Sequence, residues 1–180
     1  EALKTGCEMD KFLNFYPVSA GDFFFVAAGT IHAIGKGGFL AEVQQNSGVT
    51  YRVWDWNRLD DQGNSRELHI QKAMDVINFE SAFNKKENFD FKQNLFRQQG
   101  KIELVDHPDF HLDIVVLKAG EEVTLTPRQN ARPSAILSLG PQFRLAEQTL
   151  NSYSAALLLS GEALKVAAIE SNPGAFLYVS

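Results

Sequence analysis

The sequence predicts an all-β fold of the jelly-roll or sandwich type with one small helical segment. From residue 102 onward, short apolar segments recur at close spacing and are separated by turn-forming residues, which is the pattern of strands in such folds. Residues 39–45 and 49–56 also alternate between apolar and polar, whereas 66–78 has helical periodicity. The 180 residues, of which 44% are hydrophobic, have room for one medium or two small domains.

Charge and composition exclude several classes of protein. A net charge of -5 argues against the basic surface that binding to nucleic acid requires. No apolar run approaches the roughly 20 residues of a bilayer span, and the first residues lack the pattern of a signal peptide. Cys7 is the only cysteine, which fits a reducing compartment. We therefore expect a cytoplasmic protein with neither a nucleic-acid nor a membrane partner.

His32 is the candidate metal ligand. The apolar run after Asp22 predicts a buried strand that ends at Ala28-Gly29, and His32 follows closely. A histidine aimed by a glycine turn at a strand end suits coordination of a divalent ion. On spacing alone, a histidine that only forms a hydrogen bond near a turn is the better interpretation.

The two alternating segments place a carboxylate and a guanidinium together. In the strand predicted at 39–45, Glu42 lies on the polar face, and Arg52 lies on one face of the strand predicted at 49–56. We expect Glu42 and Arg52 to point into one barrel mouth. The simpler alternative for Arg52 is a surface arginine paired with Asp55.

A helix is expected at about 66–78, capped by Ser65 or Asn64. This assignment places His69 in the helix, and we expect packing or surface roles for it and for His107 and His111. The polar segment 80–100 is the candidate domain boundary.

The rest of the chain is rich in expected strands. They lie at 102–105, 110–117, 122–126, 135–139, 143–147, 153–159, 163–169 and 175–179. Residues 172–180 also echo the pattern of 19–27, which predicts a second, degenerate barrel that stops within or just before its last strands. Two unrelated turn-plus-strand units are the alternative.

One long run of residues carries a family resemblance. It reads Gly29-Thr-Ile-His32-Ala-Ile-Gly-Lys-Gly-Gly-Phe-Leu-Ala-Glu42-Val-Gln-Gln-Asn46-Ser-Gly-Val-Thr-Tyr-Arg52-Val-Trp-Asp55-Trp-Asn-Arg58, followed by Arg66-Glu-Leu-His-Ile70. This run resembles type I mannose-6-phosphate isomerases of Gram-positive bacteria, which belong to the cupin superfamily. The spacing from Gly21 to His32 is similar to the second cupin motif, with Ala27 in place of its usual proline and Lys36 in place of its usual asparagine.

The resemblance implies a domain plan and a set of roles. Residues 1–79 would be the C-terminal part of a metal-binding cupin barrel, 80–100 a connection, and 101–180 a second, degenerate and truncated cupin-like domain. His32 would be the last of four zinc ligands, with the other three upstream of this motif. Arg52 matches the family's active-site arginine, and Glu42 is a candidate base or a partner that orients the site.

The implied reaction interconverts mannose 6-phosphate and fructose 6-phosphate through an enediol. Such a reaction needs a base, a group that polarises oxygen and a cation for anionic oxygens, and a metal with an arginine serves the last two needs. We expect the chain by itself to have little metal affinity. A noncatalytic sugar-binding or structural cupin module is the alternative.

Overall fold

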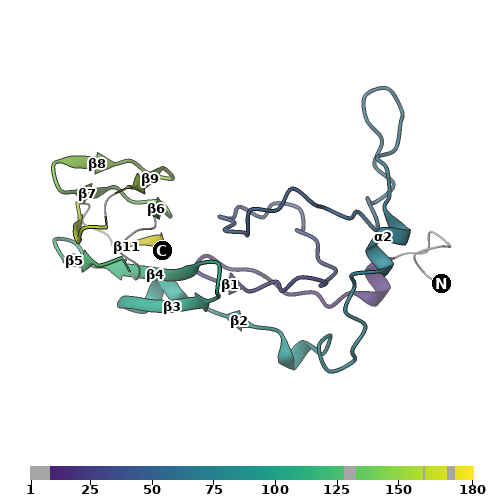
Figure 1. Cartoon of the computed structure of the whole chain (residues 1–180). Helices are drawn as coiled ribbons and strands as arrows, with labels where there is room; N and C mark the ends of the chain where they lie inside the picture. The colour runs from purple at the N-terminus through teal and green to yellow at the C-terminus, as the bar shows by residue number, and fades with distance from the viewer. Residues whose placement is uncertain (1–8, 128–132, 160, 170–172) are drawn as a thin grey trace. The chain divides into compact units, whose positions relative to one another are not determined.

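The computed structural model describes residues 9–127, 133–159, 161–169 and 173–180 (Figure 1). The chain divides into two compact units. The first comprises Glu1–Val18, Phe25–Phe39 and Asn46–Asp90, and the second comprises Ser19–Phe24, Leu40–Gln45 and Phe91–Ser180. The chain passes from the first unit to the second at residues 18 and 19, at 39 and 40, and at 90 and 91, and the last of these passages falls within the segment 80–100.

The second unit is built from two antiparallel sheets (Figure 1). The five-stranded sheet has the order β3-β4-β11-β6-β9, and the four-stranded sheet has the order β5-β10-β7-β8. Their strands are β3 (Gly100–Asp106), β4 (His111–Leu117), β5 (Glu122–Leu125), β6 (Ser134–Ser138), β7 (Phe143–Leu145), β8 (Gln148–Leu150), β9 (Ala155–Leu158), β10 (Leu164–Ala168) and β11 (Gly174–Val179).

The chain passes repeatedly from one sheet to the other, which makes this unit a jelly roll. β4, β6, β9 and β11 belong to the five-stranded sheet, while β5, the β7–β8 hairpin and β10 belong to the four-stranded sheet. Two four-stranded layers connected in this way are the jelly-roll arrangement, and β3 adds a fifth strand at the edge beside β4. The all-β fold predicted from the sequence is therefore confirmed.

Both sheets contribute to one core. The five-stranded sheet supplies Val115, Ile136, Phe176 and Tyr178, and the four-stranded sheet supplies residues such as Phe143. The rings of Phe143 and Phe176 meet edge to face with centroids 5.0 Å apart. Val115, Phe176 and Tyr178 recur at alternate positions of their strands, so strand periodicity places their side chains between the sheets.

All eight strands expected after residue 101 have a counterpart, with one difference. The single strand expected at 143–147 is a hairpin, because Ala146 has a φ of 50° and the chain reverses into β8. β11, the strand that the echo of residues 19–27 predicts, forms and pairs with β4 on one side and β6 on the other.

The first unit contains little regular structure. Its elements are the 3₁₀ helix η1 (Met9–Phe12), the α-helix α2 (Ile70–Met74) and the 3₁₀ helix η2 (Lys86–Asn88). The strand predicted at 49–56, in this unit, does not form, and neither does the one predicted at 39–45. A strand is stable only when it forms hydrogen bonds with a neighbouring strand. Among the described residues, neither segment has such a neighbour.

The helix predicted at about 66–78 is shorter than expected. α2 begins after His69, because residues 66–69 are held in other contacts that are described below, and Ser65 forms an isolated bridge with Leu59 instead of a cap. None of the helices in the described part of the chain has the length and apolar character needed to cross a bilayer.

The segments 19–24 and 91–97 of the second unit are joined to each other. β1 (Phe23–Phe24) pairs with β2 (Phe91–Lys92), and the 3₁₀ helix η3 (Leu95–Arg97) follows. The Asp22 carboxylate accepts hydrogen bonds from the backbone N–H groups of Ser19 and Asn94. The segment expected to be a plain connection therefore holds a short strand and two 3₁₀ helices.

Candidate functional site

A glycine turn positions the segment that carries His32, as the sequence predicts. Gly29 has a φ of 82°, and the N–H of Thr30 donates to the carbonyl of Ala27 over 3.2 Å. The turn also packs closely against the chain after α2, since a Cβ atom at position 29 would lie 2.7 Å from the carbonyl oxygen of Val76. Only glycine combines this φ with this close approach.

The imidazole of His32 is exposed and has one defined contact. Its Nδ1 lies 3.0 Å from the carbonyl oxygen of Thr30. Because a carbonyl only accepts, this hydrogen bond places the proton on Nδ1 and leaves the Nε2 lone pair available. Histidines that bind metals commonly donate their second nitrogen to a backbone carbonyl in this way. The ring is thus exposed rather than sealed in an apolar interior.

Arg52 is held by the segment that precedes α2. Its backbone N–H donates to Nδ1 of His69 over 3.1 Å, and its carbonyl accepts from the N–H of His69 over 2.7 Å. The guanidinium Nη1 donates to the carbonyl of Glu67 over 3.3 Å. These contacts explain why residues 67–69 are not helical. They also correct the expectation that His69 lies within the helix.

Asp55 is the centre of an ion-pair cluster. Its carboxylate is 6% exposed and accepts hydrogen bonds from Nε of Arg66 over 2.7 Å and from Nη2 of Arg58 over 2.7 Å, and also from Nη2 of Arg66. The Arg66 hydrogen bonds, with those of Arg58, hold the pKa of Asp55 well below its usual range against the opposing effect of desolvation. The same contact raises the pKa of Arg66.

The contacts of this cluster argue against the alternative in which Arg52 pairs with Asp55. Asp55 pairs with Arg58 and Arg66, and its described contacts do not include Arg52. Asp55 and Arg58 thus have a structural role, and the part played by Arg66 was missed. Its place in the segment predicted as a helix gave no signal of a contact with Asp55.

The other candidate residues have separate surroundings. Glu42 belongs to the second unit, where it is exposed and not in a strand. The two strands whose alternation was expected to aim Glu42 and Arg52 into one barrel mouth do not form, so a shared mouth stays a prediction without that support. His107 accepts from the N–H of Asp109, and His111 pairs with Asp106, so both have the local roles expected of them.

The number of ligand side chains that lie close together decides whether these residues fit a zinc ion. A catalytic zinc site needs three protein ligands. Within the described residues, no group of three His, Cys, Asp or Glu side chains is arranged to hold a metal ion. No hydrogen bond or ion pair of this part of the chain joins His32 to Arg52 either. The described residues therefore supply one suitable imidazole and not a complete site.

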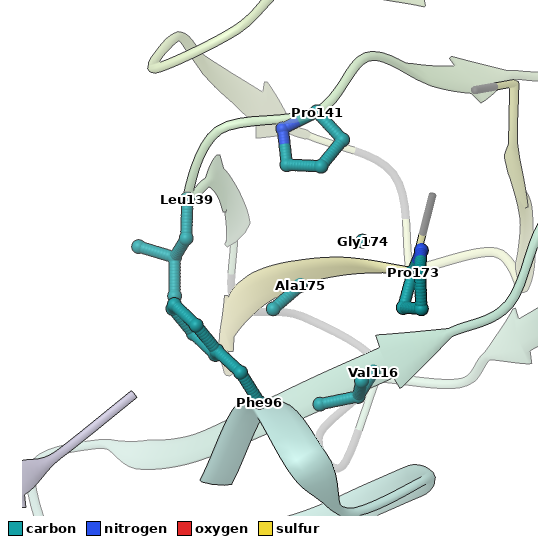
Figure 2. Close-up of a pocket in the computed structure, with 7 residues that line it drawn as sticks. All are labelled: Phe96, Val116, Leu139, Pro141, Pro173, Gly174 and Ala175. Atoms are coloured by element: carbon teal, nitrogen blue, oxygen red, sulfur yellow. The ribbon is translucent and has the colours of Figure 1, made fainter. Parts of the chain in front are cut away.

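A hollow in the second unit has a different character (Figure 2). It lies where the ends of β4 and β11 meet the loops before β7 and β11, and none of its lining residues is titratable. The lining residues are Phe96, Val116, Leu139, Pro141, Pro173, Gly174 and Ala175. This hollow contains none of the candidate residues and has no group for acid–base chemistry.

Comparison with known proteins points to one family. No family model matches the chain. It is 54% identical over 70 residues to a mannose-6-phosphate isomerase of Streptococcus mutans, which is 39% of this chain and 22% of that protein. It is 51% identical, with the same coverage, to the mannose-6-phosphate isomerase ManA of Bacillus subtilis. The matched stretch thus spans about a fifth of the length of these relatives.

Among the solved structures that resemble the chain are domains named as cupins. One is the Cupin_2 domain of an XRE family transcriptional regulator from Enterobacter cloacae, with a TM-score of 0.39, 13% identity, and coverage of 45% of this chain and 95% of that one. Another is a cupin-2 domain protein from Shewanella frigidimarina, with a TM-score of 0.36, 16% identity, and coverage of 48% and 84%. By its sequence, this chain is a relative of the mannose-6-phosphate isomerases over the 70 residues that they share.

Proposed function

We propose that these residues form part of a mannose-6-phosphate isomerase that interconverts mannose 6-phosphate and fructose 6-phosphate. The observation that carries the proposal is an identity of 51–57% over 60–70 residues to proteins named as such isomerases or as probable ones. The run from Gly29 to Arg58, on which the sequence resemblance rests, includes the exposed imidazole and the fixed arginine described above.

In this proposal Arg52 serves the anionic oxygens of the substrate. An isomerisation through an enediol develops negative charge on oxygen, and a guanidinium is always charged and donates in a planar fork. One N–H of Arg52 is committed to the carbonyl of Glu67, which leaves its other donors for the substrate. Because its backbone is held on both sides, the guanidinium needs little reorganisation when it binds.

His32 would supply one ligand to a zinc ion through Nε2, and the bound ion would polarise the substrate oxygen. The remaining ligands would come from outside the described residues, as these hold no group of three suitable side chains. We therefore expect the 180 residues alone to be inactive. Glu42 is the proposed base or orienting carboxylate, on the basis of its place in the resemblance.

The experiment is a coupled assay of fructose 6-phosphate formation by the protein that contains this chain. Arg52→Ala should lower kcat/KM by about two orders of magnitude or more, as is typical when a charge-stabilising donor is removed. Arg144→Ala is the matched control, because Arg144 is an exposed arginine on β7. An Arg52→Ala protein that is as active as the control would remove Arg52 from the mechanism.

A noncatalytic sugar-binding or structural module is the second candidate. It is favoured because the described residues hold no group of three side chains that could bind a metal ion. This function predicts that calorimetry detects binding of mannose 6-phosphate, or no binding at all, while no fructose 6-phosphate forms in the presence of zinc. Turnover that depends on zinc would exclude it.

A further inference from the structure

His69 uses its side chain on Arg52 and not on its own helix. It is the N-cap residue of α2, and no side-chain hydrogen bond caps the helix. Preferred N-cap residues are Ser, Thr, Asp and Asn, whose side chains accept a hydrogen bond from the first turn and stabilise the helix. The helix forgoes this stabilisation, while Nδ1 of His69 accepts from the N–H of Arg52.

The contact defines the state of the imidazole. A backbone N–H only donates, so Nδ1 of His69 must carry the lone pair and the ring proton is on Nε2. A doubly protonated ring has no acceptor and would lose this bond. Oε2 of Glu67 lies 3.9 Å from Nε2, and the Glu67 side chain is largely exposed. The ring of Tyr51 lies 6.3 Å from the imidazole, centroid to centroid.

Three contacts from residues 67–69 thus converge on one residue. The His69 N–H and Nδ1 hold the carbonyl and the N–H of Arg52, and the Glu67 carbonyl holds its guanidinium. The two backbone contacts fix where the Arg52 side chain begins, and the third fixes where it points. A local rule for helix caps is broken here for a contact to another segment, which is a pattern found at functional sites.

We propose that His69 is the positioning residue of Arg52, through the acceptor nitrogen Nδ1. The proposal rests on the function proposed above, in which Arg52 contacts anionic oxygens. His69 does not touch the substrate. A displacement of about 1 Å in a substrate-contacting group can cost up to a hundredfold in rate. Loss of the acceptor should therefore lower kcat more than it raises KM.

The first test is spectroscopic and does not depend on activity. In uniformly ¹⁵N-labelled protein, a scalar coupling across the hydrogen bond should connect the amide nitrogen of Arg52 with Nδ1 of His69. His69→Leu should abolish the coupling. A folded wild-type protein in which the Arg52 amide shows no coupling to any imidazole nitrogen would overturn the proposal.

The second test separates positioning from helix stability. His69→Leu, without an acceptor, should lower kcat/KM by about tenfold to a hundredfold, mostly through kcat. His69→Asn retains an acceptor at the position of Nδ1 and should recover most of the loss. Gln71→Gly is the matched control, because it weakens α2 at an exposed position and Gln71 is not one of the residues that hold Arg52.

The outcomes distinguish this proposal from the proposed function. If the wild-type protein is active and shows the coupling, but His69→Leu behaves like Gln71→Gly, the positioning role is wrong while the isomerase function stands. If His69→Asn is as impaired as His69→Leu, the acceptor atom is not what matters, and the proposal fails. A wild-type protein without isomerase activity overturns the proposed function first, whatever the coupling shows.

Discussion

The two units of this chain differ in how they are stabilised. The second unit surrounds a cluster of eleven buried residues, of which Phe143, Phe176 and Tyr178 are fully enclosed. In the described part of the first unit, Met9 and Ala73 are the only buried apolar residues, whereas Phe39 is 82% exposed. The first unit is held instead by backbone turns and by the ion pairs of Asp55.

The difference teaches that an alternating pattern does not make a strand by itself. Residues 39–45 and 49–56 alternate as clearly as the strands of the second unit, but they find no paired strand among the described residues. In the described part of the second unit each of the eleven strands has a partner, and the two larger sheets bury each other's apolar faces. Whether a segment forms a strand is decided more by pairing and burial than by its alternating pattern.

The largest effect is expected from Phe176→Ala in the second unit. Its side chain is fully buried and contacts Phe143, so truncation leaves a cavity and should lower the free energy of unfolding by about 3–5 kcal/mol. Urea denaturation measures the change. Phe39→Ala is the matched control in the first unit and should change stability by less than about 0.5 kcal/mol. Equal losses of stability in the two variants would contradict the difference in core packing between the units.

A smaller effect is expected from Gly174→Ala at the start of β11. The added Cβ would lie 2.9 Å from Cζ of Phe143 and 3.2 Å from Cβ of Pro141, so the core must shift. Overpacking of this kind costs about 1–3 kcal/mol. Gly35→Ala, in the first unit, meets no atom within 4 Å and should be neutral. The melting temperatures of the two variants compare the packing of the units directly.

The smallest effect is expected from Asp55→Asn in the first unit. The pKa of Asp55 is lowered in the folded state, so the ionised form contributes stability above the unfolded pKa of roughly 4, and this is lost as the pH falls below it. Unfolding measured between pH 7 and pH 2 should show a shallower acid loss in Asp55→Asn than in the wild type.

Asp60 should limit how far the acid loss of stability is reduced in Asp55→Asn. Backbone hydrogen bonds, above all from Asn64, also lower its pKa, so part of the acid loss should remain in Asp55→Asn. An acid profile unchanged by the substitution would show that the Asp55 cluster does not stabilise the folded state.

Much of the second unit could be predicted because its signals are local. Periodicity located all the strands expected after residue 101, and the turn residues located most of their ends. The reversal at Ala146 was missed because its hairpin turn is Ala-Glu, whereas tight hairpins usually announce themselves with Asn-Gly or a similar pair. β1 lies in the strand predicted after Asp22 but is only two residues long, and β2, equally short, was missed.

The candidate site was less predictable because its contacts are tertiary. The glycine turn before His32 could be predicted, since Gly29 has the left-handed conformation that the sequence suggests. The Arg52–His69 and Asp55–Arg66 contacts join residues that are 17 and 11 positions apart. Helical periodicity at 66–78 gave no indication that residues 66–69 serve other partners.

The place of β11 constrains how the second unit is made. β11 lies between β4 and β6 in its sheet. Before residues up to Val179 have left the ribosome, this sheet can therefore form only its β3–β4 and β6–β9 pairs. Until then, the edges of β4 and β6 remain open to unwanted pairing. Synthesis of this unit should therefore depend on chaperones more than its compact core suggests.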